Sequence, residues 1–206
     1  EVELREAERN IAYCDSMLPI KEAEAAELTK GFTFEKDSVY EEVGNYIWKQ
    51  QTIERNVQRC YIRCGVSEKG EMYLASVYFG GHPISHTGIR LSLKDGQFAT
   101  TASIPFDGGL NYRFKDMGNT TEVVTYKGEN GMEAIKFIYV NQKERIKVEY
   151  TGGKPYVIYI ADGDKRAIVA TYDLATVLSD VENMRTLKAK SEKKIAYLKA
   201  KLTDDG

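Results

Sequence analysis

The sequence predicts an α+β fold in which an antiparallel β-rich middle is flanked by two long terminal helices that pair and pack on it. Apolar residues recur at three- and four-residue intervals at both ends of the 206-residue chain. Between them, short apolar segments alternate with glycine-containing turns, and such short connections favour antiparallel neighbours. We expect a single domain, 1–206, with an N-terminal helical segment at 1–30, a β core at 31–171 and a C-terminal helix at 172–203.

The N-terminal segment has heptad-like spacing and one proline. Its apolar positions are Leu4, Ala7, Ile11, Cys14, Leu18, Ala25 and Leu28. Because proline lacks an amide proton and clashes with the preceding turn, Pro19 predicts a kink or break, with a second helical piece at about 20–29. Gly31 then favours the end of the helix.

The middle predicts about nine to eleven strands in a meander that forms a curved sheet, a sandwich or a barrel-like structure. The expected strands include residues 57–66, 72–79, 89–93, 97–102, 123–126, 134–140, 145–150, 156–161 and 166–170. Asp162-Gly163-Asp164 is predicted to be a hairpin turn, because the carboxylate that completes a calcium loop is missing nine residues on. Residues 72–75 and 156–161 are apolar on both faces, so we expect the helical pair to cover them.

The C-terminal helix shows the cleaner periodicity. Its seam comprises Leu174, Val177, Val181, Met184, Lys188, Ser191, Ile195, Leu198 and Leu202. A helix over residues 173–202 is about 45 Å long, so part of it is expected to project. The polar residues Lys188 and Ser191 interrupt the apolar seam and argue against a dimeric zipper. The lysines of this helix favour a face that is exposed to solvent. We leave the oligomeric state open.

Bulk composition excludes some classes of function. The net charge of −2 gives no global field for phosphate backbones, and we expect no nucleic-acid partner. Apolar runs have strand length, which excludes a membrane-spanning helix. Cys60 and Cys64 lie four residues apart on a predicted strand, roughly 13 Å in Cα separation and too far for a disulfide. We expect both to be buried free thiols, because Cys-x-x-x-Cys without a second pair is a weak metal pattern.

The only histidines, His82 and His86, lie in a glycine-led loop. Two imidazoles could hold a metal or act as acid and base, but a metal needs a third ligand and Pro83 prevents helical stacking of the rings. An exposed or turn-packed role is therefore favoured. No nucleotide-binding or nucleophile motif is present, so we predict no catalytic residue, no metal and no cofactor.

Several aromatic residues lie in or beside polar segments and could stack on sugars or anchor a partner. They are Tyr40, Tyr46, Trp48, Tyr112, Phe114 and Tyr126. Tyrosine is also a favoured strand residue that half-buries its ring, and this structural interpretation is preferred.

Residues 34–47, 59–63 and 74–78 resemble secreted lipoproteins of Bacteroidetes-type bacteria that have no assigned activity. The resemblance implies a helix, a β domain and a closing helix behind a removed lipid-anchor signal, and hence a cell-envelope location, periplasm or cell surface. The first residue, Glu rather than Met, agrees with a processed or truncated product. A membrane association is then expected only through that N-terminal anchor.

Two function classes follow. The preferred class is a non-enzymatic, exported cell-envelope binding module whose partner is a protein, a small molecule or a glycan. The alternative is an enzyme with a site built from scattered carboxylates, tyrosines or the His82/His86 loop. The absence of a motif-level site favours binding.

Overall fold

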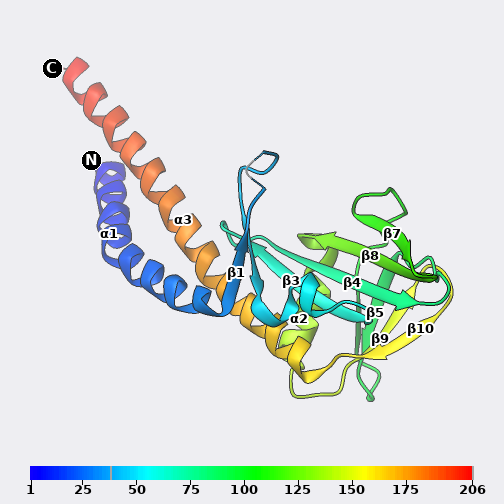
Figure 1. Cartoon of the computed structure of the whole chain (residues 1–206). Coiled ribbons are helices and arrows are strands. Elements are labelled where there is room, and N and C mark those ends of the chain that lie inside the picture. Colours follow the sequence, from blue (N-terminus) through cyan, green and yellow to red (C-terminus); the bar gives the residue numbers. More distant parts are fainter. Residues whose placement is uncertain (38, 206) are drawn as a thin grey trace.

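The protein has an α+β fold with two antiparallel sheets and a projecting pair of helices. The computed structural model describes residues 1–37 and 39–205. Helices α1 (Val2–Leu28) and α3 (Asp162–Asp204) pack against each other, as the sequence predicts. Figure 1 shows this pair leaving the β domain with both termini at its far end. No described helix is long and apolar enough to cross a membrane.

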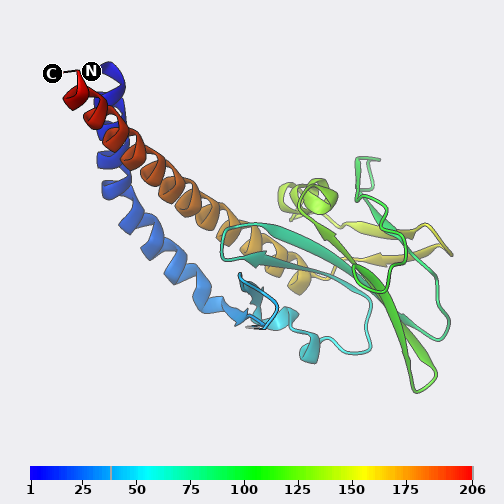
Figure 2. The same ribbon diagram turned by 90° about the horizontal axis from the view of Figure 1, so that it is seen from above.

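The paired helices approach closely along a seam of small residues. We call α1 together with residues 181–204 of α3 the stalk. Ala7, Cys14 and Ser191 are buried in it, and the Cys14 thiol donates to the carbonyl of Met184 (3.4 Å). Lys188 adds an ion pair at the edge of the seam, where its Nζ lies 2.7 Å from Oδ1 of Asp15. The view in Figure 2 shows the two helices side by side to their ends.

Pro19 does not break the first helix. It lies inside α1, which runs without interruption from Val2 to Leu28, so the expected second helical piece is not separate. Cys14 and Ala25, on either side of the proline, are both buried. Packing of both turns therefore supports the helix where proline removes a hydrogen bond. Figure 1 shows α1 bending toward the β domain.

Two helical segments were predicted wrongly as turns and strands. Helix α3 begins at Asp162, so the hairpin turn at 162–164 and the strand at 166–170 are both the first turns of this helix. Asp162 and Asp164 lie where negative charge favours a helix N-terminus. The expected strand at 134–140 belongs to helix α2 (Glu129–Val140), whose Ile135 and Ile138 face the core at helical spacing.

Ten strands are described, within the predicted range. The six-stranded sheet has the order β1 (Phe32–Glu35), β2 (Asn45–Trp48), β3 (Tyr61–Ser67), β4 (Met72–Gly80), β8 (Asn119–Lys127), β7 (Asn111–Asp116). The four-stranded sheet has the order β10 (Tyr156–Tyr159), β9 (Lys147–Thr151), β5 (Gly88–Ser92), β6 (Phe98–Thr100). All strand pairs are antiparallel, but the chain leaves the first sheet after β4 and returns at β7, so the simple meander is interrupted. The described part of the chain also contains three short 3₁₀ helices, Thr29–Gly31, Lys49–Gln51 and Ile53–Arg55.

The two faces of the six-stranded sheet differ. On the core face, Ile62 and Leu74 belong to one apolar core with Leu174 of α3. On the other face, which we call the outer face, Arg63 and Tyr73 alternate with these residues. The helices cover this sheet rather than β10. The expected burial of residues 156–161 is wrong for most of β10, an edge strand whose residues are largely exposed, although Ile160 just after it is buried in the core.

Candidate functional site

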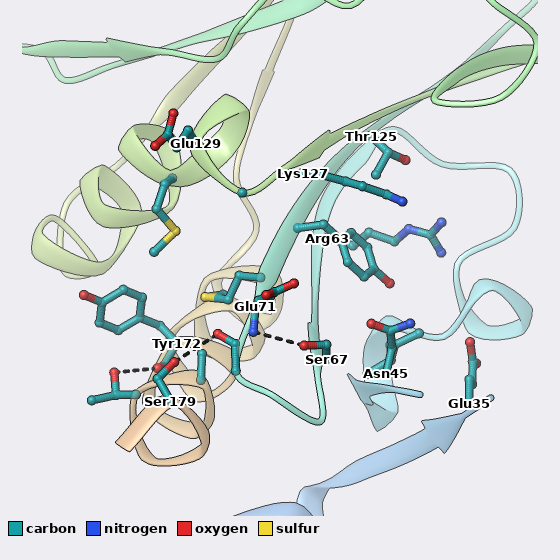
Figure 3. A pocket seen from close by; sticks show the side chains of 18 of the residues that line it. Glu35, Asn45, Arg63, Ser67, Glu71, Thr125, Lys127, Glu129, Tyr172 and Ser179 are labelled. Atoms are coloured by element: carbon teal, nitrogen blue, oxygen red, sulfur yellow. Dashed lines mark hydrogen bonds between the residues drawn. The ribbon is translucent and has the colours of Figure 1, made fainter. Parts of the chain in front are cut away.

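An open groove of about 1520 Å³ runs around the β3–β4 turn, from the outer face of the six-stranded sheet on one side to the helices α2 and α3, which pack against the core face, on the other. Figure 3 shows its two sides: Arg63, Thr125 and Lys127 from the sheet, and Tyr172 and Ser179 from α3. The turn between β3 and β4 separates them. The size is sufficient for a small ligand or a short polymer segment.

The register of β3, β4 and β8 brings the groove residues of the sheet next to one another. Tyr73 lies opposite Gly65 on β3 and opposite Lys127 on β8, while Ala75 lies between Arg63 and Thr125. All six residues therefore belong to one face. A Cβ atom at Gly65 would overlap the Tyr73 ring, so glycine here lets the ring lie flat on the neighbouring strand.

Charges on this side are incompletely paired. Arg63 forms no ion pair with a described carboxylate, and its Nε is buried without a hydrogen-bond partner. Burial raises the pKa of Tyr73 to about 12, although the nearby guanidinium of Arg63 opposes the rise. The carboxylates of Glu35 and Glu41, also on the groove wall, raise the pKa of Tyr73 further. The Tyr73 hydroxyl is thus protonated at neutral pH and able to donate.

The helix side is tied to the β3–β4 turn. The Ser179 hydroxyl donates to the carbonyl of Gly70 (3.2 Å) in the β3–β4 turn. Gly70 has a φ of 86°, and a Cβ atom there would overlap Ser179, so the turn requires glycine for both conformation and space. Met132 of α2 adds an apolar surface on this side. The groove therefore has a largely preformed shape.

A second polar cluster lies on the core face of the same sheet. The Ser76 hydroxyl lies 2.9 Å from Nε2 of His86, whose Nδ1 lies 2.8 Å from Oε1 of Glu122. The Tyr126 hydroxyl lies 2.8 Å from that of Ser76. We call these four residues the clasp. A neutral imidazole with its proton on Nδ1 satisfies both ring nitrogens.

Glu122 ties the loop after β4 to the sheet. Its carboxylate accepts from the backbone N–H groups of Ile84 (2.6 Å), Ser85 (2.8 Å) and His86 (2.9 Å), in addition to the imidazole. Burial alone would raise the pKa of Glu122, but these hydrogen bonds outweigh it and lower the pKa to about 2. The carboxylate is therefore ionised at neutral pH and acts as the anchor of residues 84–86.

The clasp has the connectivity of a Ser–His–acid catalytic unit but not its accessibility. Ser76, His86 and Glu122 are at most 2% exposed. A catalytic serine must contact a substrate carbonyl, which cannot reach a hydroxyl in the interior of the core. In this conformation the clasp is a structural network.

The two histidines do not converge, so the alternative of a metal or acid–base pair finds no support in their geometry. His82 is exposed and its carbonyl accepts from the Tyr78 hydroxyl (2.7 Å), whereas His86 is buried in the clasp. Among the described residues, no group of three or more metal-ligating side chains could hold an ion. The partners Ser76 and Glu122 are 10 and 36 residues from His86, and no motif in the sequence signals that pairing.

The remaining candidates lie outside the groove or inside the core. Cys14, Cys60 and Cys64 are free thiols, with Cys60 only partly buried. Among the aromatics, Tyr126 is fully buried and the Trp48 ring packs against Phe32. The groove residues Arg63, Tyr73 and Lys127 were missed, because single charged residues on strands have no distinguishing pattern until the register is known. Comparisons of the chain with protein-family models, curated proteins and solved structures found no match.

Proposed function

We propose that this chain is a non-enzymatic binding protein of the cell envelope, in which the groove takes a small-molecule, glycan or protein ligand. The observation that carries the proposal is the groove itself, whose wall combines the glycine-dependent β3–β4 turn with Arg63 and Lys127, for which the described residues offer no ion-pair partner. Concave sites with a few convergent polar groups are the usual form of ligand sites.

The stalk supports the envelope location. Both termini lie at the end of the stalk away from the β domain (Figure 1). Helix α3 has 43 residues and is therefore about 65 Å long. Attachment of the chain at that end, for instance through the lipid anchor that the resemblance implies, would hold the groove well away from a membrane.

A ligand screen with a matched pair of variants tests the proposal. Ligand-observed NMR with mixtures of oligosaccharides and short peptides identifies binders, which are then measured against Thr125→Trp and Thr121→Trp. Both substitutions lie on the same face of β8, but only Thr125 lines the groove. Binding should be lost in Thr125→Trp and kept in Thr121→Trp. Equal binding by both variants would place the ligand elsewhere and contradict the proposal.

The clasp favours the alternative of an enzyme. A fluorophosphonate probe reacts with activated serines, and the buried Ser76 should not be labelled in the folded protein. Labelling that Ser76→Ala abolishes would reveal an opening of the core to substrate and would replace the binding proposal with a hydrolase.

A further inference from the structure

We infer that the groove recognises its ligand through an anionic oxygen group, a carboxylate, phosphate or sulfate, held between Arg63 and Lys127. The inference rests on the proposed function, because it names the ligand chemistry of the same groove. Three features of the sheet side carry it: a guanidinium without an ion-pair partner among the described residues, a second such cation, and neutral donors around them, whereas an acidic rim limits the affinity.

Arg63 is the central feature. It lies on β3 with its side chain partly buried and forms no ion pair with a described carboxylate. Its Nε is fully buried without a hydrogen-bond partner in the described structure. A ligand in the groove cannot reach that buried nitrogen, so the contact must come from the rest of the Arg63 side chain, which lines the groove and has no ion-pair partner among the described residues. The planar guanidinium matches a carboxylate or phosphate best.

Lys127 provides the second cation. Tyr73 connects the two by register, since it pairs with Lys127 on β8 and lies two residues from Ala75, the partner of Arg63. Figure 3 shows the Arg63 and Lys127 side chains extending in the same direction over the sheet. No described carboxylate forms an ion pair with Lys127 either. Two cations on one face repel each other, and an anion between them removes that cost.

Neutral donors complete the subsite. The amide of Asn45, the hydroxyl of Thr125 and the phenol of Tyr73 all line the same wall. The Tyr73 phenol is kept protonated by burial, which raises its pKa to about 12. Donors of this kind orient an oxyanion that the cations attract.

An acidic rim limits how tightly a simple anion binds. Glu35 and Glu71 are exposed on the groove wall, and neither forms an ion pair with Arg63 or Lys127. Figure 3 places Glu35 beside Asn45, on the side formed by β1 and β2. The rim repels a bare anion but suits a ligand that also carries hydroxyl or amino groups. Inorganic anions are therefore expected to bind with a Kd on the order of 1 mM.

NMR of the arginine Nε–H groups in the full chain tests the inference. Sodium phosphate, sodium sulfate and sodium acetate are titrated separately, with sodium chloride as the ionic-strength control. The Arg63 signal, assigned by its loss in Arg63→Gln, should shift saturably while the other arginine signals stay in place. Saturation by phosphate, by sulfate or by acetate identifies the kind of oxyanion that the ligand carries.

Three variants sharpen the test. Lys127→Gln should weaken anion binding about tenfold, as expected for loss of one charge-assisted contact. Lys115→Gln removes the same charge from β7 outside the groove and should change nothing. Glu35→Gln should strengthen binding several-fold by removing rim repulsion.

The outcomes separate the inference from the proposed function. No saturable shift of the Arg63 signal, or the same shift with chloride, overturns the inference. If ligands from the screen are still blocked by Thr125→Trp in that case, the groove binds neutral compounds and the proposed function stands. If Thr125→Trp blocks nothing as well, both fail.

Discussion

The two faces of the six-stranded sheet carry polar clusters that differ in one respect. In the clasp on the core face, both imidazole nitrogens of His86 and the carboxylate of Glu122 have partners within the chain. On the outer face, Arg63 and Lys127 have no ion-pair partner among the described residues. Satisfied polar groups specify the fold, whereas unsatisfied ones at a groove indicate recognition. The clasp should therefore control stability, and the outer cluster should control binding.

Removing the centre of the clasp should have the largest effect. Glu122→Ala leaves the N–H groups of Ile84 and Ser85, and both N–H groups of His86, without an acceptor. Each buried unpaired donor costs about 1–3 kcal/mol, so the loss should reach about 4 kcal/mol and approach the total stability. Urea denaturation measures it.

A matched control variant separates the stability loss caused by breaking the clasp from the loss caused by removing a surface carboxylate. Glu149→Ala removes a half-exposed side chain on β9 whose ion pairs lie at the surface. It should cost less than about 1 kcal/mol. Equal losses in the two variants would mean that the clasp is no more important than a surface ion pair.

The pH dependence of stability should be the next largest effect. The pKa of Glu122 is lowered in the folded protein, so its contribution is complete above its ordinary value of 4.5 and is lost as pH falls toward 2. The difference of pKa values corresponds to a loss on the order of 3 kcal/mol. Urea unfolding between pH 6 and pH 2 should show this decline, and Glu122→Gln should flatten it. An unchanged slope in Glu122→Gln would assign the acid sensitivity to other groups.

Ser76→Ala should have a smaller effect within the same network. It removes the hydroxyl that joins Nε2 of His86 to the phenol of Tyr126, while the anchor of the loop at Glu122 remains. The expected loss is about 1–2 kcal/mol by chemical denaturation. A variant as stable as the parent would show that water or a shift of the ring replaces the hydroxyl.

The sequence could predict the features that depend on local patterns. The heptads of the terminal helices, for example Val177, Val181 and Met184, are local patterns, and the pairing of α1 with α3 follows from them. The start of α3 was missed because Asp162-Gly163-Asp164 satisfies the local preferences of a turn and of a helix N-terminus equally well. Tertiary packing of Ile168 on the core decides between them.

The site was less predictable because it depends on register. Arg63 and Lys127 are 64 positions apart in sequence and come onto one face only when β3, β4 and β8 align. Likewise, His86 meets Ser76 and Glu122 from two different strands. Local patterns carry periodicity but not strand pairing, so charged residues on strands cannot be grouped from sequence alone.

The smallest change in stability is expected on the outer face. Lys127→Gln removes an exposed charge that has no described ion-pair partner, so unfolding free energy should stay within about 0.5 kcal/mol of the parent. Urea denaturation of Lys127→Gln beside Ser76→Ala makes the comparison direct. Because the substitution also relieves repulsion with Arg63, a small gain fits the same argument, whereas a loss of 2 kcal/mol or more would mean that the outer cluster serves the fold and not a ligand.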